Sequence, residues 1–266
     1  MIRRTITLLT YIFSIYLLFF ALYWINLSPT IKPEVKAEET SSFVEKGAEA
    51  VKRFTGKADI ELTYFRIQSF PSGKVVYFKS ADSIYLVHES GKVVGVHSTE
   101  QTWKGELVLN ESEAFNLAKK YAEGIYENFD SRNMKMLERG LKDRGSFKEY
   151  DYLWREEVDG ISTPNYVSVR VNPYTGRISD YRCQDVGILT IPAAKIDRGQ
   201  AIELLKKRNP KISNVNAELD VWLTKDSQPL LRWTVRADLP LDGEIHRGVG
   251  IVINAVTGEI IEEFAF

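Results

Sequence analysis

Cysteine is almost absent from this sequence, because Cys183 is the single cysteine among 266 residues. One thiol cannot form an intrachain disulfide, which excludes a disulfide-stapled secreted scaffold. It also excludes structural zinc sites made of four cysteines, or of two cysteines and two histidines, since the ligands are missing.

An excess of charge of one sign is absent as well. The 35 Lys and Arg residues and the 36 Asp and Glu residues leave a net charge of -1. A dedicated nucleic-acid binder needs a basic surface to neutralise phosphates, so we expect no nucleic-acid partner. A hydrophobic content of 44% and a charged content of 27% are those of an ordinary folded protein.

The sequence also lacks the short motifs of common catalytic chemistry. It contains no HExxH, GxSxG or SxxK motif and no phosphate-binding glycine loop. We therefore predict that the protein is not an enzyme, and that it has no catalytic, cofactor-binding or metal-binding residues and no cofactor. A Ser-His-Asp triad stays open as an alternative, because such a triad assembles in space rather than along the sequence.

Two features could suggest a metal ion, and a structural interpretation is favoured for both. His88 and His97 are expected to be neighbours across the first predicted hairpin rather than metal ligands. The acidic loop with Asp238, Asp242 and Glu244 lacks the spacing of a calcium-binding loop. We expect this loop to be a solvated turn.

A long run without charge occurs at the N-terminus, where residues 5–31 contain no Asp, Glu, Lys or Arg. A helix of about 20 apolar residues spans roughly 30 Å, the thickness of a bilayer core. Arg3 and Arg4 precede the run, which favours a cytoplasmic N-terminus and an extracytoplasmic remainder. We predict a signal anchor with residues 1–4 in the cytoplasm and residues 5–27 across the membrane.

A cleaved signal peptide is the alternative to an anchor. Its apolar region is usually about 7–15 residues long and is followed by small residues at the cleavage site. Here the run is longer, and residues 22–25 (LYWI) are poor cleavage residues. A buried core helix is a further alternative, although this helix would be apolar on all sides. Residues 28–41 are polar and contain two prolines, so we predict a linker.

Three helix starts share one pattern, in which a capping residue is followed three positions later by Glu or Gln. The pairs are Ser42 with Glu45, Asn110 with Glu113, and Asp197 with Gln200. Amphipathic segments follow at 43–54, 111–129 and 198–208. We also predict a short helix in the basic segment 132–146.

After each helix, the apolar period changes from about 3.6 residues to two, which predicts strands joined by tight turns. Residues 169–178 align without gaps with residues 251–260, at an offset of 258 − 176 = 82. Residues 84–93 fit the same frame at an offset of 176 − 91 = 85. The shared turn glycine predicts a left-handed backbone conformation. Three coincidental hairpins are the alternative to a repeat.

These patterns predict an α+β fold. We expect the N-terminal transmembrane helix to be followed by two or three modules, each a helix packed on a small antiparallel sheet. The predicted boundaries are 42–105, 106–190 and 191–266, and the first module is the weakest match. Trp154, Trp222 and Trp233 lie on predicted strands, so we expect them in the core.

Residues 150–182 resemble the YcdB/YcdC-type repeat, which is related to the PepSY domain of bacterial secreted and membrane proteins. The matching residues are Tyr152, Trp154, Val158, Asp159, Gly160, Ile161, Val167, Val169, Val171, residues 172–178 (NPYTGRI) and Tyr181. Residues 197–264 resemble a PepSY unit more loosely. After Ile161, the sequence Ser-Thr-Pro departs from the pattern of the family.

The resemblance implies a role rather than a chemistry. PepSY-like domains are linked to the inhibition or chaperoning of peptidases and to regulation at the cell envelope, and the family offers no catalytic residues. We therefore expect a membrane-anchored, extracytoplasmic regulatory protein that binds a protein or peptide, such as an envelope peptidase or sensor. The alternatives are an envelope hydrolase with a non-sequential active site and a structural spacer.

The expected binding surface is a sheet face or edge in a closing hairpin. The candidates lie around Val167 to Val171 in the second module and around Ile251 to Ile253 in the third. Unpaired strand edges can accept an added strand through backbone hydrogen bonds. The other expected contact is with the lipid bilayer, through the N-terminal helix.

Overall fold

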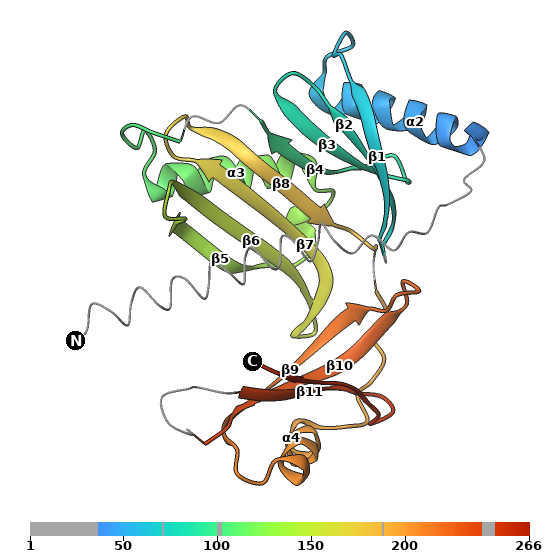
Figure 1. Ribbon diagram of the computed structural model, residues 1–266, viewed down its shortest axis with the longest axis vertical. Helices are drawn as coiled ribbons and strands as arrows, with labels where there is room; N and C mark the ends of the chain where they lie inside the picture. Colours follow the sequence, from blue (N-terminus) through green and yellow to red (C-terminus); the bar gives the residue numbers. More distant parts are fainter. Residues whose placement is uncertain (1–36, 71, 100–102, 188, 241–247) are drawn as a thin grey trace. The chain divides into compact units, whose positions relative to one another are not determined.

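The computed structural model describes residues 37–70, 72–99, 103–187, 189–240 and 248–266, and the side chains from residue 41 onward (Figure 1). The chain divides into two compact units, Met1–Ser42 and Phe43–Phe266. The predicted anchor and residues 28–36 of the predicted linker lie outside the described residues. No helix in the described part of the chain is both long and apolar enough to cross a membrane.

The described residues form a strand-dominated α+β fold in which one order of elements recurs three times. A helix precedes four strands in each case. The helices are α2 (Ala37–Thr55), α3 (Glu111–Ile125) and α4 (Arg198–Arg208). The strands after α2 are β1 (Thr63–Phe70), β2 (Gly73–Lys79), β3 (Ser83–His88) and β4 (Val93–Ser98). Those after α3 are β5 (Met134–Asp143), β6 (Lys148–Val158), β7 (Ile161–Asn172) and β8 (Arg177–Gln184). Those after α4 are β9 (Ser213–Leu223), β10 (Pro229–Asp238), β11 (Gly248–Asn254) and β12 (Ile260–Ala265).

The twelve described strands join one hydrogen-bonded sheet rather than separate small sheets. Within each set of four, consecutive strands are antiparallel neighbours. Strand β4 pairs with β8, and Ser162 of β7 pairs with Asp220 of β9. The expectation of separate sheets is wrong because strands from different sets share backbone hydrogen bonds across these two junctions.

Each helix lies in a core cluster with the strands that follow it. On α3, the buried residues Ala114, Ala118 and Ala122 recur every fourth position, which places them on one face of the helix. They belong to a core that also contains Tyr152 and Trp154, and Figure 1 shows α3 across β5–β8. The small alanine side chains leave room for these large rings.

The cores around α2 and α4 are also formed by residues of the helix together with residues of the strands that follow it. Val51 of α2 lies in a cluster with Val76 and Phe78. Leu205 of α4 lies in a cluster with Trp233. Apolar burial on one face of each helix therefore stabilises each set of elements, at roughly 25 cal/mol per Å² of apolar surface removed from water.

Two of the three predicted helix starts are confirmed as capping boxes. Asn110 caps α3 together with Glu113, and Asp197 caps α4 with Gln200. The third prediction is wrong, because α2 begins at Ala37 and already contains Ser42. The preceding sequence Ala-Glu-Glu-Thr includes good helix formers, and they extend the helix into the predicted linker.

The prediction of a short helix within residues 132–146 is also wrong. The short 3-10 helix η1 (Phe129–Ser131) ends before this segment, and most of the segment forms strand β5. Its register with β6 runs from Met134 opposite Glu156 to Asp143 opposite Lys148. Gly140 has φ +122, which a helix cannot accommodate. Long-range pairing therefore overrides the helix propensity of the Lys, Glu and Arg residues.

The closing hairpins have the predicted glycine conformation. Gly91, Gly176 and Gly258 have φ values of 82, 66 and 80, in the left-handed region where a Cβ is strained. In the second and third hairpins, the turn asparagines Asn172 and Asn254 accept hydrogen bonds from the backbone amides two and three residues later. These two turns therefore have the same internal hydrogen bonds.

All three closing hairpins also share a β-bulge. The bulged residue is the third after the turn glycine in each case: Val94, Ser179 and Ile261. The first turn is one residue shorter, because Val87 pairs with Val93 where Val171 pairs with Ile178. The offset of 85 therefore holds after this turn, and the offset before it is 171 − 87 = 84. A bulge at the equivalent position of all three hairpins supports the interpretation that they are repeats of one unit.

Candidate functional site

The two surfaces expected to bind a partner are not exposed edges. Val167, Val169 and Val171 are fully buried, and β7 pairs with β6 on one side and with β8 on the other. Ile251 and Ile253 lie in β11, which pairs with both β10 and β12. These expectations were wrong because an apolar alternating strand is equally typical of the middle of a sheet.

The unpaired edges lie on other strands. Within the described residues, β1 pairs only with β2, β5 only with β6, and β12 only with β11. Each carries an exposed apolar side chain: Phe65 on β1, Leu137 on β5 and Ile261 on β12. Such an edge presents free backbone donors and acceptors to an added strand.

The expectation that His88 and His97 are neighbours across the first hairpin is wrong, because His97 lies opposite Ile84 and His88 lies opposite Val75. The His88 ring nitrogens lie 2.8 Å from Ser90 Oγ and 2.6 Å from Ser72 O. The His97 Nδ1 atom lies 3.2 Å from Asp180 Oδ2. The described residues contain no group of His, Cys, Asp and Glu side chains that could hold a metal ion. His246 lies outside the described residues.

The acidic loop is described only at its start. Asp238 accepts a hydrogen bond from Asn214 Nδ2 at 2.8 Å. Asp242 and Glu244 lie outside the described residues. The carboxylate of Asp238 thus has a structural partner at the end of β10.

Two of the three tryptophans are in the core as predicted, and the third is not. Trp154 and Trp233 are buried, and Trp233 donates from Nε1 to Ile196 O at 2.7 Å. Trp222 is 49% exposed, with the Arg232 guanidinium 4.3 Å from its ring centroid. Its neighbours Val221 and Leu223 occupy the core-facing side of β9, so strand alternation directs Trp222 to the opposite face.

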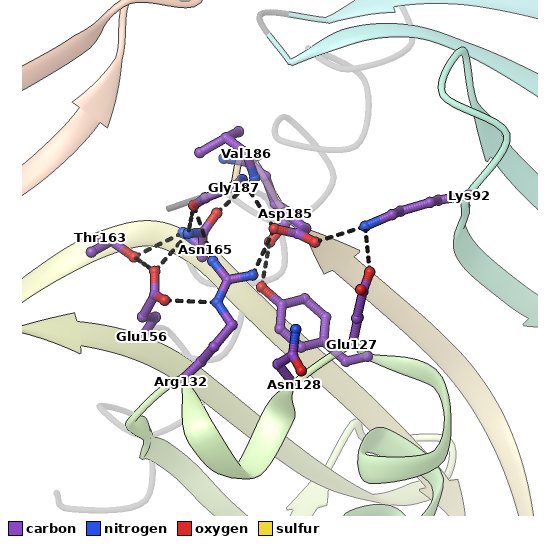
Figure 2. Close-up of polar contacts among 12 residues, drawn as sticks. Lys92, Glu127, Asn128, Arg132, Glu156, Thr163, Asn165, Asp185, Val186 and Gly187 are labelled. Atoms are coloured by element: carbon purple, nitrogen blue, oxygen red, sulfur yellow. Dashed lines mark hydrogen bonds and ion pairs between the residues drawn. The ribbon is translucent and has the colours of Figure 1, made fainter. Parts of the chain in front are cut away.

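A buried charged cluster forms around Arg132, which follows the 3-10 helix η1 (Figure 2). Arg132 Nε donates to Glu156 Oε1 and Nη1 donates to Asp185 Oδ1, both at 2.7 Å. Its Nη2 donates to Gly187 O at 3.1 Å. The Arg132 side chain is 12% exposed and that of Glu156 is 7% exposed. The guanidinium therefore joins β6 to the segment that follows β8.

Two buried side chains of β7 complete this Arg132 cluster. Glu156 Oε2 accepts from Thr163 Oγ1 at 2.9 Å and from Asn165 Nδ2 at 2.6 Å. Asn165 Nδ2 also donates to Gly187 O at 2.9 Å, and Asn165 Oδ1 accepts from the Val186 amide at 2.8 Å. The backbone of the segment after β8 is thus hydrogen-bonded to Asn165 of β7 through the Val186 amide and the Gly187 carbonyl.

Lys92 connects the β3–β4 turn to the same cluster. Its Nζ lies 3.1 Å from Glu127 Oε2 and 3.2 Å from Asp185 Oδ2, and Figure 2 shows it reaching Asp185 from the neighbouring hairpin. Lys92 is about half exposed. Its ion pairs are therefore worth less than the buried ones, since solvent and salt screen them.

The electrostatics of the cluster favour full ionisation. Burial acts to raise the pKa of Glu156, but hydrogen bonds from Arg132, Asn165 and Thr163 outweigh it and the net pKa is lowered. Burial likewise acts to raise the pKa of Asp185, and its hydrogen bonds from Arg132 and the Gly187 amide lower it overall. Neither carboxylate is therefore suited to hold a proton for acid catalysis near neutral pH.

A second set of buried carboxylates lies nearer the start of β6. Ser179 Oγ donates to Glu149 Oε1 at 2.7 Å, and Arg170 Nε lies 3.7 Å from both Glu149 Oε2 and Asp151 Oδ1. Arg144 also pairs with Asp151. Burial is the main influence on both carboxyl groups and raises the pKa of each. One strand thus carries carboxyl groups with opposite pKa shifts.

The Arg132 cluster was not predicted from the sequence. Its partners Glu156 and Asp185 lie in elements far from Arg132 in the chain, and no local pattern joins them. Its members form hydrogen bonds with one another, and the hydroxyl of Thr163 is buried and donates to Glu156. A fully hydrogen-bonded buried network fixes positions. The arrangement therefore positions the chain after β8.

One protein family matches part of this chain. Residues 82–185, from the start of the β3–β4 hairpin to Asp185, match the family described as the YcdB, YcdC repeated domain. The match includes residues 150–182 and supports the resemblance seen there. It also includes Lys92 and Asp185, which join the hairpin to the Arg132 cluster.

A solved structure, the Bacillus megaterium YpeB C-terminal domain, is similar over 84% of this chain and 96% of that chain. The sequence identity is 15% and the TM-score is 0.45. None of the curated proteins matches this chain.

Proposed function

We propose that this chain is a membrane-anchored, extracytoplasmic protein that binds and regulates a protein partner at the cell envelope through a sheet edge, without catalysis. The observation that carries the proposal is that β1, β5 and β12 each have only one described neighbour. Each edge offers backbone N–H and C=O groups to a strand of a partner. An anchor would hold these edges near membrane proteins and raise their effective concentration there.

The charged clusters support binding over chemistry. Arg132, Glu156 and Asp185 are engaged with one another and with backbone groups. An envelope hydrolase would need a nucleophile, a base and an orienting group within hydrogen-bonding reach. A resemblance to domains linked to peptidase regulation favours a peptidase or sensor as the partner.

Site-specific photo-crosslinking in native membranes tests the proposal. A photoreactive residue is placed at Phe65, Leu137 or Ile261 of the full chain, and at Lys206 as an exposed control on α4. We expect a discrete crosslinked product with one protein from an edge position and none from Lys206. Equal products from all four positions, or no product from any edge, would contradict binding through an edge.

The same purified chain is assayed for peptidase, esterase and glycosidase turnover. We expect none above the blank. Robust turnover that disappears when one Ser, His or Asp is changed would replace the proposal with the hydrolase.

A further inference from the structure

One joint within the chain shows how the edge of a closing strand can be used. Strands β4 and β8 are the last strands of the first two sets, and they pair with each other in antiparallel orientation. Three pairs define the register: Gly95 with Arg182, Val96 with Tyr181, and His97 with Asp180. The joint between the first two sets is therefore a contact between two last strands.

This joint has a local two-fold symmetry. Val96 is the fifth residue after Gly91, and Tyr181 is the fifth residue after Gly176. The central pair thus consists of equivalent positions. The flanking pairs exchange equivalent positions, because Gly95 corresponds to Asp180 and His97 to Arg182. An antiparallel contact between two copies of one structural unit has this arrangement.

Strand β12 is the last strand of the third set and is equivalent to β4 and β8. Its outer side is unpaired within the described residues. It carries the same bulge, at Ile261, as the two last strands that do pair. Gly248 and Phe266 exchange two backbone hydrogen bonds, of 2.7 and 3.0 Å. Alternation along the β11–β12 ladder then directs the N–H and C=O of Glu263 away from β11. Glu263 is the fifth residue after Gly258, the position of Val96 and Tyr181.

The residue at this central position restricts which strand can pair with the outer edge of β12. Val96 and Tyr181 are uncharged, whereas Glu263 is a carboxylate whose Oε1 accepts from Arg208 Nε at 2.9 Å. A second copy of the chain, paired in the same way, would place Glu263 opposite the Glu263 of that copy. Like charges directly opposite each other destabilise a strand pair. A strand with a basic residue at its centre would instead be complementary.

We infer that the outer edge of β12 binds an antiparallel strand of another protein, in the register that joins β4 to β8, and that this strand carries Lys or Arg opposite Glu263. The inference rests on the proposed function and specifies its site. The edges of β1 and β5 belong to first strands, for which the chain has no such joint. Strand β5 also carries Lys135 and Lys142, and lysines on an edge discourage added strands.

The full chain can serve as its own probe. A copy with Glu263→Lys presents the complementary charge on an identical last strand, so it imitates the inferred partner. Wild-type and variant chains with different affinity tags are mixed, purified through both tags and quantified. We expect at least tenfold more double-tagged complex for wild type with Glu263→Lys than for wild type with wild type.

Glu262→Lys is the matched control. It makes the same change of charge one residue away, but in this register residue 262 lies opposite Phe264 rather than another carboxylate. We expect the Glu262→Lys copy to give no enrichment. Enrichment equal to that of Glu263→Lys would show that the change in net charge, rather than the pairing of residue 263, causes the association. That result would overturn the inference.

Two further outcomes would also overturn it. One is the absence of enrichment by a Glu263→Lys chain that melts within a few degrees of wild type. The other is strong self-association of the wild type, abolished by Glu263→Pro, which would make the occupant a second copy. In either case, a crosslink from Phe65 or Leu137 would still support the proposed function, so the two failures are distinguishable.

Discussion

At the scale of the residue, Arg132 is a buried cation that joins β6 to the chain after β8. It pairs with Glu156 and Asp185 and also donates to Gly187 O. The stability of such a pair depends on both partners, because a single charge left buried has nothing to offset its desolvation.

We predict that Arg132→Met destabilises the chain by about 3–5 kcal/mol, the range for breaking one side of a buried ion pair. Urea unfolding followed by fluorescence measures the change. The double change Arg132→Met with Glu156→Met should recover part of the loss, since it removes the stranded carboxylate as well. A double variant no more stable than Arg132→Met would show that the arginine acts through something other than this pair.

The turn glycines support a second prediction at this scale. Gly258 has φ +80, and a Cβ there would lie 3.1 Å from the Ile196 side chain. We predict that Gly258→Val costs roughly 1–3 kcal/mol through backbone strain. Gly124 in α3 is the control, because its φ is not positive and nothing lies within 4 Å of a Cβ there. Thermal melting temperatures equal to that of wild type for both Gly176→Val and Gly258→Val would contradict the repeat alignment.

Residue-level features that depend on neighbours in the sequence were predictable. The capping boxes at Asn110 and Asp197 and the left-handed glycines are of this kind. Arg132 and Trp222 were not predictable. The partners of Arg132 come from distant elements, and the side of a strand that faces the core is set by the whole sheet.

At the scale of the element, strand β6 carries carboxyl groups with opposite pKa shifts. The folded-state pKa of Glu149 is raised by burial, and that of Glu156 is lowered by its hydrogen bonds. A raised pKa contributes stability that is present below the unfolded pKa and is lost as pH rises through the folded pKa. A lowered pKa contributes stability that is present above the unfolded pKa, about 4.3 for Glu, and is lost as pH falls.

Two isosteric variants on this strand should therefore respond to pH in opposite ways. We predict that Glu149→Gln becomes more stable relative to wild type as pH rises from 4 to 7, since it avoids burying a charge. Glu156→Gln should become less stable relative to wild type over the same range, since it loses a charge-assisted contact with Arg132. Urea unfolding at both pH values measures each difference. The same sign of change for both variants would contradict the opposite shifts.

Strand β5 shows where prediction of an element from sequence ends. Its Lys, Glu and Arg residues favour a helix in isolation, but pairing along β6 decides its conformation. The strands around the turn glycines were easier to predict, because short-range turn chemistry and alternation agree there.

At the scale of the whole molecule, the recurrence of a helix followed by antiparallel strands could be expected from caps, turns and periodicity, but strand β5 of the second set could not. The joining of the three sets into one sheet could not. The pairing of β4 with β8 brings together Val96 and Tyr181, which are 85 positions apart in the sequence. The caps, turns and apolar periodicity of a set are the same whether or not its last strand pairs with another set. These local patterns therefore do not predict the pairing of β4 with β8.

The predicted orientation in the membrane applies to the whole chain and can be tested directly. We predict that residues beyond about 30 are extracytoplasmic, because Arg3 and Arg4 precede an uncharged span long enough to cross a bilayer. The full chain with Glu34→Cys is expressed in cells, and a membrane-impermeant thiol reagent is applied before and after lysis. We expect the introduced thiol to be labelled fully on intact cells.

The native Cys183 provides the background for this measurement. Its side chain lies in the core cluster of α3, and burial raises its pKa to about 11, so little reactive thiolate is present at neutral pH. The wild-type chain should therefore remain unlabelled in both conditions. A third chain, with Ile2→Cys, reports the cytoplasmic side and should react only after lysis.

The pair of variants separates the possible arrangements of the N-terminus, because each thiol reports one side of the membrane. If Glu34→Cys reacts only after lysis and the Ile2→Cys chain reacts on intact cells, the orientation is the reverse of the one predicted. If the Glu34→Cys chain is recovered from the medium without its N-terminus, the run of residues 5–31 is a cleaved signal rather than an anchor.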